Sequence, residues 1–184
     1  MSDISTLPGT LDTVWQRLFD GVVNRTLPAH TPVLATTGPE GPEARMVVLR
    51  AVDRQAGTVE FYSDLRAEKV AQLQADPRAT LLIWDAQALL QIRLRARFDV
   101  IAGDAAEPQW QALSPPSRTL YGGSPPPGAP LGTPADHCNG PDRAAFAVLR
   151  GTLDRIETLL LRPDHHRRAV FTAADGWLGG WRAP

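Results

Sequence analysis

A strict two-residue alternation that begins at Gln91 constrains the fold more than any other feature of the chain. From Gln91 to Phe98 every second residue is apolar, and the residues between them are polar. The polar residues are Gln91, Arg93, Arg95 and Arg97. Alternate side chains of an extended chain point to opposite faces, so this pattern predicts a strand with one face in a core. We interpret the basic face as solvated or partner-facing and paired with carboxylates, because no aromatic residue interleaves with the arginines as in a nucleic-acid groove.

Several shorter segments have strand composition and are separated by turn residues. Strands are predicted over 33–37, 44–52, 58–62, 80–84, 145–149 and 156–161. The segment 80–84 is nearly all apolar, which predicts a strand covered on both faces. Residues 153–161 also have a helical interpretation. Short turns between most strands favour antiparallel pairing, so the sequence predicts a mainly β fold, a small antiparallel β-barrel with helices on its outside.

Helical patterns occur at three places in the chain. Within the N-terminal segment 1–28, apolar residues recur at helical spacing from Leu11 to Val22. Further helices are predicted over 66–75 and from about residue 104 to Leu113. The proposed capping residues are Thr10, Asp64, and the pair Asp104 and Glu107. A chain of 184 residues is long enough for one hydrophobic core, so we predict a single domain over 1–184.

One segment cannot form regular structure. Residues 122–141 hold six prolines and five glycines. A loop of this length in a compact domain is usually a functional flap or a disordered segment. The sequence favours neither interpretation over the other.

Composition excludes several classes of protein. The formal net charge is −1, so no global field predicts a nucleic-acid or anionic membrane partner. We see no apolar run long enough for a spanning helix and no secretory signal, and the single cysteine, Cys138, fits a reducing cytoplasm. No Gly-x-Gly-x-x-Gly motif or phosphate-binding loop motif is present, and no bound metal is predicted.

Two short strings carry candidate binding residues. The first is Arg45 to Arg50, and the second runs from Phe61 to Asp64 and is followed by Lys69. Lys69 is the only lysine among 19 basic residues of the Lys and Arg types. It stands in the first turn after a predicted strand–helix junction, where backbone N–H groups bind phosphate.

These residue types match the needs of an anionic planar cofactor such as FMN. Its phosphate needs cations, a hydroxyl group and a helix start, which Arg45, Ser63 and Lys69 with the helix after Asp64 supply. Its ring needs an apolar slot with a few hydrogen bonds, which the backbone of 46–49 and the amide of Gln91 supply. The same residues also have an ordinary structural interpretation as strand-end charges, a cap and a solvated lysine.

A series of motifs occurs in one order along the chain. It consists of Arg-x-Val-x-Leu-Arg from Arg45, Phe-Tyr-Ser-Asp-x-Arg-x-x-Lys-x-x-Gln-Leu from Phe61, Asp-Pro-Arg-Ala-Thr-Leu from Asp76, Gln-x-Arg-x-x-Ala from Gln91, and a final Trp-Arg-Ala-Pro. This series resembles the FMN-binding split-barrel proteins related to pyridoxamine 5′-phosphate oxidase. The resemblance implies a six-stranded antiparallel split barrel that forms a homodimer, with FMN at the interface.

The resemblance also implies roles for individual residues. Arg45, Ser63 and Lys69 are placed near the phosphate, and Tyr62 and Gln91 beside the ribityl chain or ring. The backbone residues placed along the ring are Met46, Val47, Val48 and Leu49, with Arg50 following them. Arg50 and His166 are placed on the substrate side, and Arg168 matches an arginine that reaches FMN from the partner subunit.

Four positions depart from the pattern of the oxidase. Glu68 replaces an arginine next to the phosphate lysine, and Thr158 stands near the position of a ring-stacking tryptophan. Asp164 replaces the substrate arginine two residues before His166, and Arg50 replaces a substrate-side lysine. The flavin site is therefore mostly kept, whereas the pyridoxamine phosphate pocket is not.

Three functional hypotheses follow from these observations. The first is an FMN-dependent oxidoreductase that transfers hydride at flavin N5 to or from an unknown small molecule. The second is pyridoxamine 5′-phosphate oxidase itself, and the third is a non-enzymatic flavin or haem binder, such as a stress-response protein. The sequence leaves FMN, F420 and haem open as cofactors.

Overall fold

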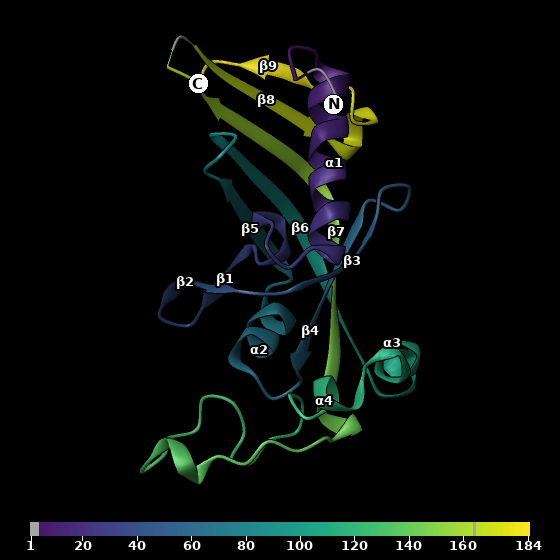
Figure 1. The fold of residues 1–184 in the computed structure, drawn as a ribbon, viewed down its shortest axis with the longest axis vertical. Coiled ribbons are helices and arrows are strands. Elements are labelled where there is room, and N and C mark those ends of the chain that lie inside the picture. Colours follow the sequence, from purple (N-terminus) through teal and green to yellow (C-terminus); the bar gives the residue numbers. More distant parts are fainter. Residues whose placement is uncertain (1–3, 164) are drawn as a thin grey trace.

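The computed structural model describes residues 4–163 and 165–184 (Figure 1). One antiparallel sheet dominates it. The strands are β1 (Val33–Gly38), β2 (Gly41–Met46), β3 (Leu49–Asp53), β4 (Thr58–Asp64), β5 (Arg78–Asp85), β6 (Leu90–Ala102), β7 (Phe146–Leu161), β8 (His166–Thr172) and β9 (Gly180–Arg182). Their order is β2-β1-β5-β6-β7-β4-β3, with β8 paired to β7 and β9 paired to β8. The prediction of a mainly β antiparallel fold with flanking helices is confirmed, although the described residues form nine strands and not six.

The 16-residue strand β7 explains how the sheet is split. One edge of β7 pairs with β6 over most of its length. Its other edge pairs with β4 over residues 146–152 and with β8 over residues 155–161. The register against β6 shifts between Arg95 and Ala96, so that Asp154 is the extra residue of a β-bulge. A bulge bends and twists its strand, which separates the β4 half of the sheet from the β8 half.

The helices lie outside the sheet. They are α1 (Leu7–Val23), α2 (Glu68–Ala75), α3 (Glu107–Ala112) and α4 (Pro115–Arg118), and the short 3₁₀ segments are η1 (Pro28–His30), η2 (Gly103–Ala106), η3 (Pro134–Asp136), η4 (Arg143–Ala145) and η5 (Ala173–Asp175). The apolar stripe of α1 buries Val14, Trp15 and Leu18 in the main core. A second cluster packs Trp110 of α3 and Tyr121 against Phe146 at the start of β7.

All three predicted helix caps are wrong. Thr6, and not Thr10, caps α1, because the Thr6 hydroxyl accepts a hydrogen bond from Gly9 N–H. The N-cap of α2 is Ala67, which offers no side-chain oxygen, and α3 also lacks a side-chain cap. The carboxylates of Asp104 and Glu107 instead bind the guanidinium of Arg143, 39 and 36 residues away. A long-range ion pair has therefore replaced the expected local cap.

Several predicted strand limits also change. The segment 44–52 is not one strand, because Val47 N–H makes the last bond of the hairpin, to Pro32 O at 3.0 Å, and the chain then pairs with β4 from Leu49 onward. Residues 146–161 are one strand, so the helical alternative for 153–161 is wrong. Strand β5 is not covered on both faces, since Trp84 is 45% exposed. The alternation from Gln91 is confirmed, with the apolar side chains buried and Arg93, Arg95 and Arg97 exposed.

Candidate functional site

The structure brings three of the predicted phosphate residues together where β2, β4 and α2 meet. We call Arg45, Ser63, Lys69, Thr36 and Gln72 the cationic corner. The Lys69 ammonium donates a hydrogen bond to Ser63 Oγ at 3.2 Å. Arg45 donates to Thr36 Oγ1 and, at 3.0 Å, to Gln72 Oε1. Thr36 Oγ1 in turn donates to Gln72 Oε1 at 2.6 Å, so buried polar side chains fix the guanidinium in place.

The charge balance of the cationic corner favours an anion. Burial and then the nearby charge of Arg45 lower the pKa of Lys69 from its ordinary value, and the Asp64 carboxylate opposes this only in part. Arg45 pairs with the carboxylate of Glu43 at 2.7 Å. Among the ion pairs of residues 4–163 and 165–184, none includes Lys69. A half-buried ammonium without a contacting carboxylate is stabilised by any anion that binds beside it.

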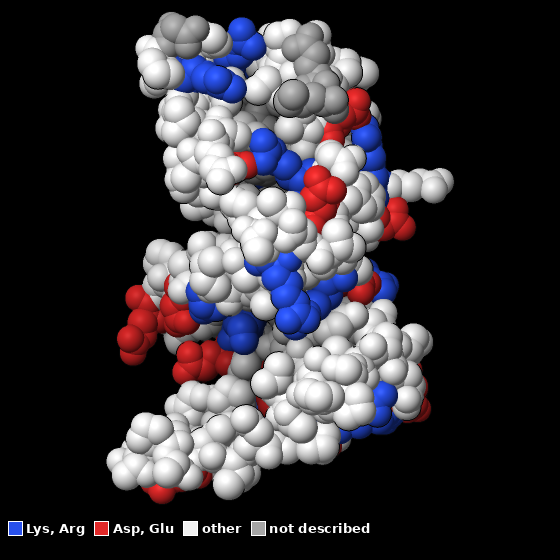
Figure 2. Space-filling model, viewed as in Figure 1, with Lys and Arg blue, Asp and Glu red and all other residues white. Residues whose placement is uncertain are grey.

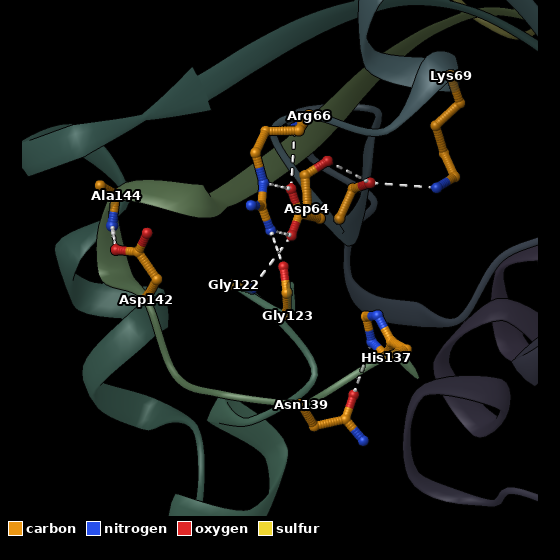
Figure 3. Close-up of polar contacts among 10 residues, drawn as sticks. Asp64, Arg66, Lys69, Gly122, Gly123, His137, Asn139, Asp142 and Ala144 are labelled. Atoms are coloured by element: carbon orange, nitrogen blue, oxygen red, sulfur yellow. Dashed lines mark hydrogen bonds and ion pairs between the residues drawn. The ribbon is translucent and has the colours of Figure 1, made fainter. Parts of the chain in front are cut away.

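Asp64 does not cap α2, as the sequence had predicted, but joins two distant segments (Figure 3). Its buried carboxylate binds Arg66 through two side-chain hydrogen bonds, at 2.9 and 2.7 Å. It also accepts a hydrogen bond from Gly122 N–H at 3.1 Å, while Arg66 donates to Gly123 O at 2.9 Å. Burial alone would raise the pKa of Asp64, but the hydrogen bonds from Arg66 and Gly122 lower it below its ordinary value. Asp64 therefore stays ionised and fastens the start of segment 122–141 beside Ser63.

Glu68 is the departure that most threatens phosphate binding. It is exposed at the first turn of α2, one residue before Lys69. Its carboxylate lies beside Gly128, where a Cβ atom would stand 3.3 Å from Glu68 Oε1. Arg66 is bound to Asp64 and forms no ion pair with Glu68 among the described residues. Glu68 is therefore drawn toward segment 122–141.

Arg50, at the end of the first binding string, contacts Tyr62 of the second string and also Tyr121. The Arg50 guanidinium lies over the Tyr62 ring, 5.8 Å from its centroid. Burial raises the pKa of Tyr121, and the charge and hydrogen bonding of Arg50 oppose that rise. Arg50 Nε is buried and has no hydrogen-bond partner.

The backbone segment predicted to follow the flavin ring lies between β2 and β3. Met46 ends β2 with a side chain that is 60% exposed, whereas Val47 and Leu49 are buried. Val47 and Val48 lie outside the strand pairing. Val47 N–H still bonds Pro32 O, so the change of pairing leaves Val48 between the β1 ladder and the β4 ladder.

Gln91, His166 and Arg168 do not join the cationic corner within one protomer. Gln91 and Arg168 pair with opposite edges of β7 at the same residue, Leu159. This row lies in the β8 half of the sheet, which Figure 1 shows at the end opposite to α2 and segment 122–141. His166 is exposed at the start of β8. These three residues are therefore not part of the cationic corner of their own chain.

A buried carboxylate organises the charges around Arg168. Glu157 Oε1 lies 2.9 Å from Arg168, and its Oε2 lies 3.1 Å from Arg155 and 3.3 Å from Arg93. Arg95 pairs with Asp154 at 2.6 Å. The prediction that the basic face of β6 is paired with carboxylates is confirmed for Arg93 and Arg95. Figure 2 shows basic and acidic side chains interspersed on the face in view, unlike a continuous basic groove.

Sequence reasoning missed Thr36, Gln72 and Tyr121. Gln72 had a usable signal, because it follows Lys69 by three residues and so shares its face of the helix. Thr36 alternates with the buried Leu34, which places it on the inner face of its strand. Nothing in the local sequence of Tyr121 indicates its contact with Arg50. The predicted substrate position Asp164 lies outside the described residues.

Comparison with known proteins identifies the family. The model of the pyridoxamine 5′-phosphate oxidase FMN-binding domain matches residues 12–102. The pyridoxine/pyridoxamine 5′-phosphate oxidase 2 of Arabidopsis thaliana is 31% identical over 136 residues, which cover 66% of this chain and 67% of the relative. The chain belongs to the pyridoxamine 5′-phosphate oxidase family.

Other members of this family match over shorter stretches. The pyridoxine/pyridoxamine 5′-phosphate oxidase of Cupriavidus pinatubonensis is 34% identical over 95 residues, covering 50% of this chain and 44% of that protein. The match thus spans less than half of the relative. The solved structure of a pyridoxamine 5′-phosphate oxidase-related FMN-binding protein from Nostoc punctiforme aligns with a TM-score of 0.74 at 23% identity, covering 94% of this chain and 96% of the other. That similarity shows the split-barrel fold.

No helix in the described part of the chain is both long and apolar enough to cross a membrane.

Proposed function

We propose that this protein binds FMN with the phosphate in the cationic corner and acts as an FMN-dependent oxidoreductase on a small molecule. The observation that carries the proposal is the half-buried Lys69 ammonium, which stands beside Arg45 and has no contacting carboxylate among the described residues. Cations fixed by buried partners are suited to a permanent anion such as a phosphate monoester. The family match supports FMN as the molecule that carries it.

The residues of the corner fit this cofactor. Lys69, Arg45 and the Ser63 hydroxyl would hold the phosphate, and the backbone of residues 46–49, where the pairing changes from β1 to β4, would follow the ring. Arg50 would face the substrate side, where its buried Nε lacks a partner. FMN, when bound, supplies two-electron redox chemistry, while the protein supplies binding and orientation.

We further propose that the working unit is a homodimer. Gln91, His166 and Arg168 lie in the β8 half of the sheet, so they would complete the corner of a second copy and not their own. Glu157 holds the Arg168 guanidinium at 2.9 Å. Exposed apolar side chains, Met46 next to the ring segment and Trp84 on β5, would be covered in such a dimer.

The substrate is proposed to be a small molecule other than pyridoxamine 5′-phosphate. The chain has Asp164 and Arg50 where the resemblance places the substrate arginine and lysine of the oxidase. An arginine is not a geometric equivalent of a lysine at a phosphate, and an aspartate would repel one. We also propose a cytoplasmic location, which is consistent with the single cysteine, Cys138.

The test is a visible spectrum of the purified protein with mass spectrometry of the released cofactor. We expect a flavin spectrum and the mass of FMN, and we expect Arg45→Ala and Lys69→Ala to lose the colour. A colourless protein that takes up no added FMN, or a released haem or F420, would refute the proposal. Aerobic incubation with pyridoxamine 5′-phosphate should yield no pyridoxal 5′-phosphate; formation of that product would establish the oxidase activity instead.

A further inference from the structure

The segment Gly122–Pro141, which we call the strap, projects from the body of the protein near α2 (Figure 1). Its two ends are closed by a hydrogen bond from Asp142 N–H to Tyr121 O at 2.8 Å. Ser124 and Cys138 then exchange two backbone hydrogen bonds of 2.9 Å each. Residues 131–137, which lie beyond this bridge, are exposed throughout. The strap is thus defined at its base and has little contact with the protein beyond it.

The base of the strap is fastened to the cationic corner. Asp64 directly follows Ser63 in the chain and accepts the hydrogen bond from Gly122 N–H. Arg66, two residues later, donates to Gly123 O. Ser63 is the residue that contacts the Lys69 ammonium. A ligand bound to Lys69 and Ser63 would therefore lie next to the fixed end of the strap.

A second contact joins the strap to the corner through a charge. The Glu68 carboxylate neighbours Lys69 in sequence and lies beside Gly128 of the strap. A phosphate at Lys69 would repel this carboxylate and favour positions farther from the corner, on the side of the strap. An anion bound in the cationic corner therefore changes the electrostatic force on the Glu68 carboxylate, which lies beside Gly128 of the strap.

A third contact, between His137 and Gly123, lies within the strap itself. The His137 ring packs on Gly123 so closely that a Cβ atom at position 123 would lie 2.6 Å from His137 Cε1. Asn139 Oδ1 lies 3.3 Å from His137 Nε2 and steadies the ring. Figure 3 shows His137 and Asn139 on the strand of the strap that returns past Gly123. The absence of a side chain at Gly123 is what admits the ring to this place.

We propose that the strap folds over the cationic corner when an anion occupies it, with His137, seated on Gly123, forming the face that lies against the ligand. This inference rests on the anion site of the proposed function. The hydrogen bonds of Asp64 and Arg66 to Gly122 and Gly123 fix the hinge end of the strap. The exposed residues beyond the bridge between Ser124 and Cys138 are the moving end. The strap would then exclude water from the bound phosphate and limit the size of the ligand.

The chain provides its own probe of this movement. Cys138 is its only cysteine, it is exposed, and it follows His137 directly. The rate at which N-ethylmaleimide alkylates Cys138 reports the accessibility of the strap and needs no activity measurement. We expect saturating FMN to lower this rate several-fold, inorganic phosphate to lower it as well, and riboflavin, which lacks the phosphate, to leave it unchanged.

Two variants and a matched control complete the experiment. Gly123→Ala displaces His137, and Arg66→Lys loses the paired hydrogen bonds to Asp64, so both should lose the protection by FMN. Gly140→Ala is the control, because a Cβ atom at position 140 meets nothing within 4 Å. Protection in Gly140→Ala should equal that of the wild-type protein.

The outcomes separate the strap from the proposed function. Flavin fluorescence in the same samples shows whether FMN is bound. If FMN binds and the alkylation rate of Cys138 does not change, or if Gly140→Ala behaves like Gly123→Ala, the strap proposal is wrong. If FMN does not bind but phosphate still protects Cys138, the strap stands and the flavin function fails. If neither FMN nor inorganic phosphate lowers the alkylation rate of Cys138, the strap proposal is wrong.

Discussion

Replacing Lys69 by methionine tests the physical basis of the site most directly. Methionine is also unbranched and apolar along its stem, so the substitution removes mainly the ammonium group. Lys69 is half-buried and its ammonium contacts Ser63 Oγ at 3.2 Å. The buried partners that fix Arg45, which are Thr36 and Gln72, do not touch Lys69 and should keep their positions.

The expected loss can be worked out from the contacts. A hydrogen bond to a charged group contributes about 1.5–3 kcal/mol. At about 1.4 kcal/mol for each factor of ten, removal of the Lys69 ammonium should raise the Kd for FMN about 10- to 100-fold. The affinity for riboflavin should not change, because riboflavin has no phosphate to meet the ammonium. Arg54→Met serves as control, because Arg54 is exposed and pairs with Asp12 at a distance from the corner.

The pH dependence of FMN binding provides an independent check. Burial and the charge of Arg45 lower the pKa of Lys69 from its ordinary value of 10.5. A lysine with a lowered pKa loses its proton at a lower pH than a free lysine, and the neutral amine binds phosphate poorly. The affinity of the wild-type protein should therefore fall as pH rises through this lowered pKa, below 10.5. Lys69→Arg keeps its charge and should show no such fall.

The assay is a titration of flavin fluorescence at fixed ionic strength, because salt screens phosphate binding. The reasoning is refuted if Lys69→Met binds FMN within about twofold of the wild-type protein, a difference below 0.5 kcal/mol. It is also refuted if riboflavin binding weakens to the same extent. In that case the ammonium would act on the fold of the site and not on the phosphate.

Three further predictions concern the fold and its charge network. Gly151→Ala should lower the free energy of unfolding by about 1–3 kcal/mol in denaturant titrations, because its Cβ would lie 2.7 Å from the buried Phe98 ring, whereas Gly140→Ala should have no effect. Trp15→Ala should cost about 3–5 kcal/mol in the same assay, since Trp15 is fully buried on α1; a loss under 1 kcal/mol would contradict the assigned core. Glu157→Gln should destabilise the protein by about 1–3 kcal/mol at neutral pH. Burial alone would raise the pKa of Glu157, but Arg155, Arg93 and Arg168 lower it below 4.5, so wild-type and variant stabilities should converge as pH falls through that lowered pKa; a pH-independent difference would contradict this.

Much of the fold could be predicted because its signals are local. The alternation from Gln91 to Phe98 specifies which side chains of β6 are buried, since side chains of an extended chain point alternately to its two faces. The apolar spacing on α1 specifies its buried stripe in the same way. Strand ends were less predictable, because after Val47 the chain changes its pairing from β1 to β4, and no local pattern encodes this change of partner.

In the candidate site, too, the local signals could be predicted from the sequence and the long-range contacts could not. The two binding strings and the lone Lys69 could be found in the sequence, and the structure brings Arg45, Ser63 and Lys69 together. The expected caps at Asp64 and Glu107 failed because each carboxylate found a distant arginine or amide partner. A charged side chain exchanges a weak local bond for stronger charge-assisted ones when folding brings such partners near.

The sequence by itself determined the mainly β class, the buried faces of β6 and α1, and the residue types available to an anionic cofactor. Only the tertiary structure decided which of these residues meet. It joined Asp64 to Gly122 across 58 positions, set Tyr121 against Arg50, and placed Gln91 and Arg168 away from the corner of their own protomer. The reason is physical: residue periodicity fixes the direction of a side chain, whereas its partner depends on how distant segments pack against it.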